Sequence, residues 1–468
     1  MIGPLKKFGR ASAKKLVIDA ISLIFSRFIQ VGSRFLYLVI VARMLGPELY
    51  GQLSYSQSWY LVFFQFCMLG LPSVVARAAG RGGEEADRVI SGSNGAVFVA
   101  CTVLAILAGA ITWLIESDPA VRLVSTIFSI GVLTRGVAVW IEILLIAYER
   151  SRRILLTSLF IRPAEPIFAY ILLAYGWGVA GLATVHVSLW ALHALIVGIV
   201  YLRVKRRITM HFRLPVVIPL LKDGAALWIG GGAIGYLQVG PVIVHKWMDG
   251  SDLGILAILT QVVVVLGVVP LSIMQALLPA MSRQVENPAG DSRNLTSVMM
   301  STFLIGGALC STVAHVVAYP VLLLILGEVY AQSASVLWVS VFTIGIFGAA
   351  LTMNQLLTAK GRYYQVGIAS VVGCAAFFAM GTIEGNPTPF STMIAASVGY
   401  GVWFLVAAIF AGFLIPGLTT ATIACLCVIP MIFVEQPLMA LITVPILIGY
   451  VWATGLLNQI KTLFSIAD

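Results

Sequence analysis

Residues 38–59 read LVIVARMLGPELYGQLSYSQSW, and this stretch holds the end of one apolar run, a short polar turn and the start of another apolar run. Gly46 and Pro47 mark the turn, because glycine and proline interrupt regular structure more strongly than other residues. The apolar run before the turn reaches back to about residue 17, and the run after it continues to about residue 76. A membrane-spanning helix needs about 20 apolar residues. The stretch therefore predicts two membrane helices joined by a tight turn.

The composition of the whole chain agrees with this interpretation. Of the 468 residues, 60% are hydrophobic and only 10% are charged, and the mean hydropathy is +1.00. A soluble domain carries about 25% charged residues, so a soluble globular or disordered protein is excluded. All six cysteines fall within apolar stretches without the spacing of metal ligands, which excludes a disulfide scaffold. A polytopic membrane protein is what remains.

Apolar windows bounded by charged residues, glycine or proline predict an all-α polytopic membrane protein with fourteen transmembrane helices. The predicted spans are 17–43, 52–76, 93–115, 121–148, 154–175, 178–202, 217–245, 253–282, 297–327, 332–358, 364–382, 389–413, 415–433 and 437–458. The connections between them are short, so the sequence predicts no soluble domain on either side of the membrane.

The basic residues predict the orientation. The net charge is +10, from 29 Lys and Arg residues against 19 Asp and Glu residues. If residues 1–16 form a cytoplasmic basic segment, most of these cations fall in cytoplasmic loops, whereas the outer loops hold Arg43, Arg122 and Lys246. Cytoplasmic loops of membrane proteins carry such an excess of Lys and Arg. An even number of spans then places both termini in the cytoplasm.

Two pairs of similar stretches indicate an internal repeat. RMLGPELYGQL at 43–53 matches KWMDGSDLGIL at 246–256, and LLIAYER at 144–150 matches LLTAKGR at 356–362. Both offsets are close to 200 residues, so spans 1–6 and 7–12 are predicted to be two copies of one six-helix unit. Because six is even, the two copies are parallel. The predicted organisation is a first lobe at 17–213, a second lobe at 214–413, and two additional spans within 414–468.

Apart from residues near the span edges, such as Lys222, the charged residues within the predicted spans are confined to the first lobe. The cationic ones are Arg27, Arg34, Arg135 and Arg162, and the acidic ones are Glu142, Glu165 and, at the inner edge, Asp19. An arginine at the centre of a lipid-facing helix costs about 2.5–3.5 kcal/mol. These arginines are therefore expected to face a polar cavity or one another, and not the lipid.

The spacing of these residues leaves several arrangements open. Arg162 and Glu165 are three residues apart and are expected to form an ion pair within a helix that two prolines interrupt. Arg135 and Glu142 are two turns apart and either form a structural pair or line the cavity. No acidic residue of span 1 neutralises both Arg27 and Arg34, which are also two turns apart, so we expect these two to form an anion-binding face.

The stretch at 38–59 resembles the polysaccharide-biosynthesis flippases, the Wzx-type branch of the MOP superfamily. The first span of that family ends in an AR-x-LGP-E-x-[YF]-G pattern, which is matched by Ala42, Arg43, Leu45, Gly46, Pro47, Glu48, Tyr50 and Gly51. LLTAKGR at 356–362 is similar to the L-x-A-x-G-[RK] turn of the family, and FSR at 25–27 is similar to the first span of the lipid II flippases. That resemblance implies that Arg27 and Arg34 occupy cavity positions.

The resemblance implies a flippase of the bacterial inner membrane that moves an undecaprenyl-pyrophosphate-linked oligosaccharide to the periplasmic leaflet. Such an oligosaccharide is a repeat unit of O-antigen, exopolysaccharide or capsule. Arg27, Arg34, Arg135 and Arg162 would bind the substrate, and Glu142, Glu165 or Asp19 would couple transport to H⁺ or Na⁺, with Glu142 favoured. No cofactor and no nucleic acid is expected. The expected partners are membrane lipids and the polymerase and glycosyltransferases of the same pathway, and the chain is expected to be a monomer.

Two other classes compete with this interpretation. A MATE-like or other ion-coupled exporter of the MOP superfamily would share the fold, but a carrier of cationic drugs would favour acidic residues in its cavity. A membrane glycan polymerase or glycosyltransferase would need larger loops to hold catalytic groups. His186 and His193 are seven residues apart with no third ligand type nearby, so they do not predict a metal site. The chain is therefore predicted not to be an enzyme.

Overall fold

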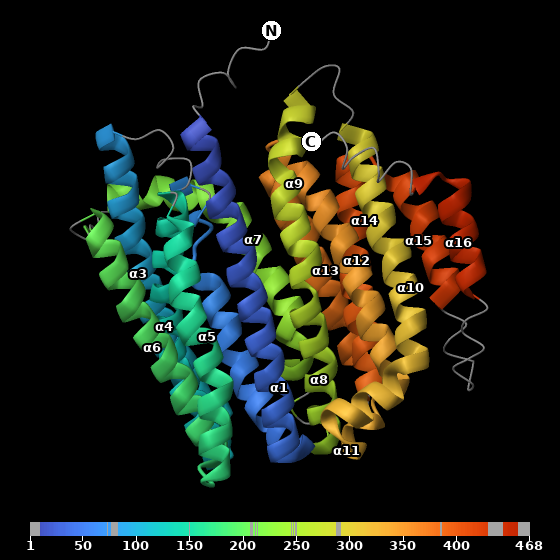
Figure 1. Ribbon diagram of the computed structural model, residues 1–468, viewed down its shortest axis with the longest axis horizontal. Coiled ribbons are helices and arrows are strands. Elements are labelled where there is room, and N and C mark those ends of the chain that lie inside the picture. The colour runs from blue at the N-terminus through green and yellow to red at the C-terminus, as the bar shows by residue number, and fades with distance from the viewer. Residues whose placement is uncertain are drawn as a thin grey trace. The chain divides into compact units, whose positions relative to one another are not determined.

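The computed structural model describes residues 10–72, 74–75, 83–148, 150–205, 209–210, 212, 214–244, 246, 248, 250–286, 292–383, 386–428 and 443–456. The regular secondary structure of these residues is helical (Figure 1). An all-α polytopic membrane protein is therefore confirmed.

The first half of the chain contains long apolar helices that follow the predicted spans closely. They are α1 (Arg10–Cys67), α3 (Gly83–Ile115), α4 (Pro119–Ala147), α5 (Ser151–Ala174), α6 (Gly178–Lys205) and α7 (Leu214–Val244). The helix α1 begins within the predicted basic segment 1–16, of which residues 1–9 lie outside the described part of the chain.

The second half continues in the same way. Its helices are α8 (Gly250–Leu266), α9 (Val268–Glu286), α10 (Ser292–Leu326), α11 (Glu328–Ala331), α12 (Ala334–Ala359), α13 (Tyr363–Ile383), α14 (Pro389–Ala411), α15 (Leu414–Val428) and α16 (Thr443–Ala453). Among the described residues, 11 helices are long and apolar enough to cross a membrane. The first of them contains two predicted spans, and α15 and α16 are shorter apolar helices, so the helices agree with the predicted fourteen spans.

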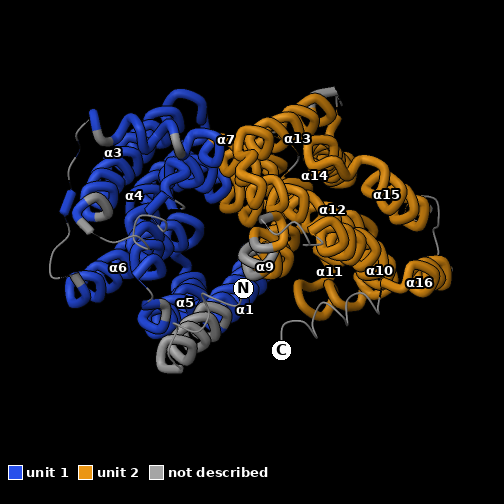
Figure 2. The backbone as a smooth tube through the Cα atoms, turned by 90° about the horizontal axis from the view of Figure 1, so that it is seen from above, with its two compact units in different colours: residues 1–45, 56–228 blue, residues 46–55, 229–468 orange. Residues whose placement is uncertain are grey.

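The chain packs into two compact units, which are coloured separately in Figure 2. Unit 1 comprises residues 1–45 and 56–228, and unit 2 comprises residues 46–55 and 229–468. In unit 1, α4 packs against α3 and α6, and α5 packs against α6. In unit 2, α12 packs against α10 and α14 and is the most buried of the described spans. Each unit therefore has one helix at its centre.

The turn at Gly46 interrupts α1 as the sequence predicts. Gly46 has φ 72° and ψ 173°, which is the non-helical conformation inside this long helix. A residue with a Cβ atom is strained in that region of φ/ψ space, so only glycine is suited to the position. Pro47 follows and has no N–H to continue the helical hydrogen bonds. The LGP sequence therefore separates the first two spans.

The predicted span 253–282 corresponds to one candidate membrane span, Gly250–Met274, that has a local break at Gly267 between α8 and α9. Pro270 supplies the reason. It cannot donate a hydrogen bond to the carbonyl of Leu266, four residues earlier, where α8 ends. Hydropathy alone does not detect this break, since both helices are apolar.

The second pair of repeated stretches has the same local geometry in both copies. At the end of α4, the N–H of Tyr148 donates to Leu144 O at 3.0 Å; at the end of α12, Lys360 donates to Leu356 O at 3.0 Å. The next turn is also shared. Arg150 N donates to Leu145 O and Arg362 N donates to Leu357 O, both at 2.8 Å. The central helices of the two units thus end in equivalent turns.

The first pair of repeated stretches is in direct contact within unit 2. A Cβ atom at Gly51 would lie 2.9 Å from Gly254 N, and a Cβ atom at Gly254 would lie 2.0 Å from Pro47 O. These distances are too short for any side chain. The glycine that recurs in both stretches is therefore required by the close approach of one copy to the other.

The orientation predicted from charge can be tested directly. We expect a reporter that is active only in the cytoplasm to be active when fused after Asp468, because the basic loops favour the cytoplasmic side. Fusions within 116–122 and 246–252 are expected to be active only outside. An active periplasmic phosphatase after Asp468 would contradict the fourteen-span topology.

Candidate functional site

The charged residues of the predicted spans come together within unit 1, on four helical segments. Glu142 and Arg135 lie on α4, Arg162 and Glu165 lie on α5, and the second half of α1 contributes Tyr60. The helix α6 contributes His186, Trp190 and His193, which are all buried. We call these eight residues the charged cluster.

Glu142 is the acceptor at one end of the charged cluster. Its Oε1 atom lies 2.9 Å from Nε2 of His193 and 3.6 Å from Nη2 of Arg162. The exposed fractions of the side chains are 17% for Glu142, 8% for Arg162 and 0% for His193. A carboxylate in such a place is stable only when it is paired, because burial of a single charge is costly. Glu142, Arg162 and His193 therefore form one structural unit.

A second chain of hydrogen bonds starts at Glu165. Its Oε1 atom lies 2.5 Å from Nδ1 of His186, whose Nε2 atom lies 2.7 Å from the hydroxyl of Tyr60. Arg135 Nη1 donates to the same hydroxyl, also at 2.7 Å. Because Nε2 of His186 and Arg135 both contact one oxygen atom, the position of the proton on His186 decides the direction of the chain. A carboxylate, an imidazole, a phenol and a guanidinium are thus connected in sequence.

The indole of Trp190 links the two chains. The guanidinium carbon of Arg162 lies 4.2 Å from the centre of the indole ring, and that of Arg135 lies 4.9 Å from it. Arg135 also lies 4.4 Å from the ring centre of Phe64. A cation over an aromatic ring gains about 2 kcal/mol or more when it is desolvated. The aromatic rings therefore stabilise charges that the two carboxylates do not neutralise alone.

The register of α4 and α6 explains why these partners meet. Arg135 and Glu142 are two turns apart on α4, and His186 and His193 are two turns apart on α6. The two helices pack against each other. His193 bonds to Glu142, and His186 and Arg135 bond to the same hydroxyl of Tyr60. Both spacings are visible in the sequence, but the sequence does not show which residues of the two helices pair. The equal spacing is the signal that could have identified the histidines.

The ion pairs differ from those that the sequence predicts. The ion pair of Arg162 is formed with Glu142 on α4, and Glu165 instead binds His186. The predicted pair of Arg162 with Glu165 is therefore wrong. Arg135 does not pair with Glu142 either, because its guanidinium is bonded to Tyr60. Pairs between helices form in place of the pair within α5, because α4 and α6 place buried partners beside Arg162 and Glu165. Neutralisation stabilises a charge most where the charge is buried.

Arg27 and Arg34 lie beside the charged cluster, in the first half of α1. Arg27 is exposed, and its Nη1 atom donates to Gln30 Oε1 at 3.3 Å. Its charge acts on Glu142 and Arg162, and the half-buried Arg34 acts on Glu165. Both arginines therefore contribute to the same electrostatic environment, from the first half of α1.

The four arginines and two glutamates leave the site positive. The set holds four guanidinium groups and two carboxylates, so its net charge is +2 while the histidines are neutral. The corresponding helices of unit 2 hold polar but uncharged pairs, such as Asn354 with Trp403 and Thr343 with Ser397. The structure thus has a cationic site in unit 1 that suits an anionic group.

The charged cluster is not saturated by protein atoms. Within the described part of the chain, the buried Nε atoms of Arg135 and Arg162 and the Nδ1 atom of His193 have no hydrogen-bond partner. Buried donors usually have one. The described residues contain no group of three or more side chains that could hold a metal ion. The side chain of Asp19, the third predicted coupling residue, lies outside the described residues.

The fold is the one found in transporters of the MOP superfamily. The chain is similar to the lipid II flippase MurJ in an inward closed conformation, with 13% identity and a TM-score of 0.68 over 96% of this chain and 99% of that one. It is also similar to an inward-facing multidrug-resistance MATE transporter of that superfamily, with 14% identity and a TM-score of 0.64 over 86% of this chain and 98% of that one. The eukaryotic MATE transporter AtDTX14 matches with 14% identity and a TM-score of 0.56, over 88% and 98%.

The chain belongs to the polysaccharide biosynthesis protein family. The family model matches residues 16–285, which is more than half of the chain and includes every residue of the charged cluster. A search of curated proteins finds no match. The family predicted from the motif at 38–59 is thereby confirmed.

Proposed function

We propose that the protein is a flippase that moves an undecaprenyl-pyrophosphate-linked oligosaccharide from the cytoplasmic to the periplasmic leaflet of the bacterial inner membrane. The observation that carries the proposal is the excess of two positive charges at membrane depth in unit 1. A pyrophosphate that bears about two negative charges is complementary to it, and guanidinium groups bind phosphate in a bidentate manner. The polysaccharide-biosynthesis family and the fold of a lipid II flippase support the same substrate class.

In the proposed mechanism, Arg27 and Arg34 make the first contacts with the pyrophosphate, because Arg27 is exposed and Arg34 is only half-buried. Arg135 and Arg162 attract the pyrophosphate through their charge without contacting it first. Their bonds to Tyr60 and Glu142 also hold α1, α4 and α5 together. The uncharged polar pairs on the helices of unit 2, such as Asn354 with Trp403, suit a glycan of variable composition. The two units would then alternate in exposing the substrate to either side of the membrane, as in other two-lobed carriers.

Deletion of the gene provides the direct test. We expect the mutant to lose surface polysaccharide and to accumulate lipid-linked repeat units that a membrane-impermeant glycan probe, added to spheroplasts, does not reach. Lysis should make the same units accessible. If the probe labels the units equally in intact mutant and wild-type spheroplasts, the protein is not the flippase.

A MATE-like exporter is the second candidate, because MATE transporters share the fold. Such an exporter of cationic compounds would need negative charge at its binding site, whereas the charged cluster together with Arg27 and Arg34 is positive. Efflux of a cationic dye is therefore expected to be the same with and without the protein. Dye efflux that depends on the protein, together with normal polysaccharide export in the deletion strain, would favour the exporter.

We further propose that Glu142, with His193, is the site that couples transport to H⁺ or Na⁺. The groups that face Glu142 are His193 on α6, Arg162 on α5 and, through its charge, Arg27 on α1. Of these, the imidazole can exchange a proton with the carboxylate across 2.9 Å. Glu165 and Asp19 are the alternative coupling residues, and Glu165 is bound more closely to its histidine.

The Glu142→Gln variant tests this assignment. We expect export to become independent of pH and Na⁺ and to fall at least tenfold where the wild type is fastest, because the amide keeps the shape but cannot be ionised. Initial rates of export in proteoliposomes with imposed gradients would measure it. Glu328→Gln, on an exposed residue of α11, is the matched control. An unchanged response of Glu142→Gln to both ions would contradict the proposal.

A further inference from the structure

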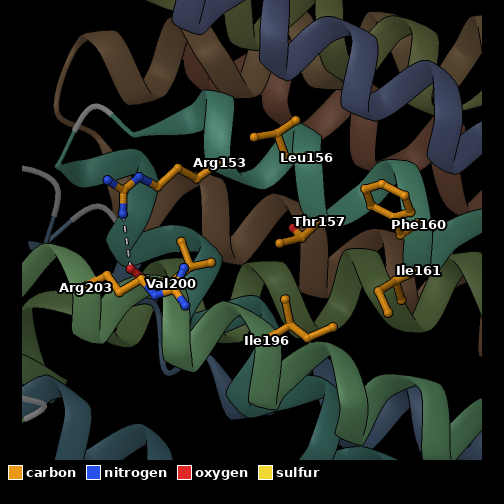
Figure 3. Close-up of a pocket in the computed structure, with 8 residues that line it drawn as sticks. All are labelled: Arg153, Leu156, Thr157, Phe160, Ile161, Ile196, Val200 and Arg203. Carbon is orange, nitrogen blue, oxygen red and sulfur yellow. Dashed lines mark hydrogen bonds between the residues drawn. The ribbon is translucent and has the colours of Figure 1, made fainter.

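A groove on unit 1, lined by no residue of the charged cluster, runs between α5 and α6 (Figure 3). Its volume is about 450 Å³, which is within the range of about 300–1,000 Å³ that is usual for sites of small ligands. The residues that matter for its chemistry are Arg153, Leu156, Phe160, Ile196, Val200 and Arg203.

The groove has a basic end and an apolar wall. The two arginines lie together at one end, and Phe160 lies at the other (Figure 3). Arg153 and Phe160 are seven residues apart on α5, so the groove extends for about 10 Å along the helix at 1.5 Å per residue. Phe160 is 78% exposed and Leu156 is 51% exposed, so the apolar wall opens onto the surface of unit 1.

The arginines are arranged to receive an anion. Arg153 Nη1 donates to the carbonyl of Val200 at 3.3 Å, and this bond fixes the guanidinium beside α6 while its other N–H groups stay available. Arg203 is exposed, and none of the described residues pairs with its guanidinium. Both side chains lie at the end of the helix pair where the sequence is basic, beside Arg150 and Arg152.

We propose that this groove binds an anionic phospholipid, with its phosphate held by Arg153 and Arg203 and one acyl chain lying against the apolar wall. Basic pockets between membrane helices on the cytoplasmic side bind anionic lipid headgroups in this way. The polyprenyl tail of a glycan carrier is a poorer fit, because an uncharged tail makes no use of two guanidinium groups. The inference stands on the groove alone and does not depend on the proposed transport function.

The site would affect the charged cluster through shared helices. Arg153 and Arg162 are both on α5, and Arg203 and His193 are both on α6. A lipid that bridges the basic ends of the two helices would hold them together, and the pairs formed by Glu142 with His193 and Arg162 depend on that spacing. Anionic lipid is therefore expected to stabilise unit 1.

Native mass spectrometry of the full-length, delipidated protein in detergent tests the proposal. The probes are phosphatidylglycerol, which is anionic, and phosphatidylcholine, which is not. We expect Arg153→Gln with Arg203→Gln to weaken binding of the first phosphatidylglycerol about tenfold or more, because charge-assisted hydrogen bonds are lost. Binding of phosphatidylcholine should not change. Phosphatidylglycerol should also raise the melting temperature of the wild type but not of the double variant.

Two further variants make the experiment specific. Val200→Trp, or Ile196→Trp if the first does not fold, fills the groove and is expected to weaken phosphatidylglycerol binding while both arginines are kept. Arg362→Gln is the matched control, because Arg362 also donates to a backbone carbonyl of a neighbouring helix, Phe410 O at 3.2 Å, but lies in unit 2. Equal phosphatidylglycerol binding by the wild type and the double arginine variant would overturn the proposal, as would an equal loss of both lipids.

Discussion

Replacing Arg27 and Arg34 together by alanine is expected to abolish polysaccharide export almost completely while the protein stays in the membrane at its normal level. Arg27 is exposed and Arg34 half-buried, and the site has more positive charge than its carboxylates neutralise. Removal of two arginines from membrane depth does not hinder insertion, because a charge in that position is itself unfavourable. The measurement is complementation of a deletion strain, with membrane abundance determined in parallel.

The single Arg→Lys variants separate charge from geometry. Lysine keeps the positive charge but offers a point charge instead of a planar fork, so export per molecule is expected to fall without disappearing. Arg122→Ala is the control, because Arg122 bonds to Glu116 O and stacks on Trp113, outside the charged cluster. Normal export per molecule in the Arg27→Ala, Arg34→Ala double variant would refute an anion-binding role.

The second large effect is expected for substitution of Arg162, which should lower the stability of the folded protein. Arg162→Ala leaves Glu142 buried without its guanidinium partner, and breaking such a buried pair costs about 3–5 kcal/mol. We therefore expect much lower membrane abundance and a lower melting temperature in detergent. The loss should appear even when export is not assayed.

Removal of both charges provides the contrast. Arg162→Met combined with Glu142→Gln leaves no unpaired charge, so most of the lost stability is expected to return, because a buried pair often contributes little over neutral residues. Export should stay impaired, since Glu142 is the proposed coupling residue. If Arg162→Ala is as stable as the wild type, or if the double variant is no more stable than the single one, the pair is not structural.

These two results would divide the four arginines that the sequence assigns to substrate binding. Arg27 and Arg34 are expected to affect export without affecting abundance. Arg162, with an exposed side-chain fraction of 8%, is expected to affect abundance first. Arg135 resembles Arg162, because it is bonded to the buried Tyr60 and lies against aromatic rings. Direct contact of Arg135 and Arg162 with substrate stays a prediction.

The sequence by itself determined the class of fold. The spans follow from hydropathy, because lipid requires long apolar helices whose backbone groups bond internally. The break at Gly46, the family motif and the restriction of membrane charges to the first lobe were also visible in residue order. The sequence even contained both two-turn spacings of the charged cluster, since helical periodicity fixes which residues of one helix share a face.

Only the tertiary structure decided which charges meet. Helical periodicity gives the rotation of a residue about its own axis, but not which neighbouring helix lies opposite or at what depth. The packing of α4, α5 and α6 therefore decided that Glu142 meets Arg162 and His193, and that Glu165 meets His186. Within one helix, Arg162 and Glu165 had the spacing of a pair. Each is instead paired with a buried residue of a neighbouring helix. If Arg162 and Glu165 paired with each other, Glu142 would lose its guanidinium partner, and a buried charge without a partner is costly.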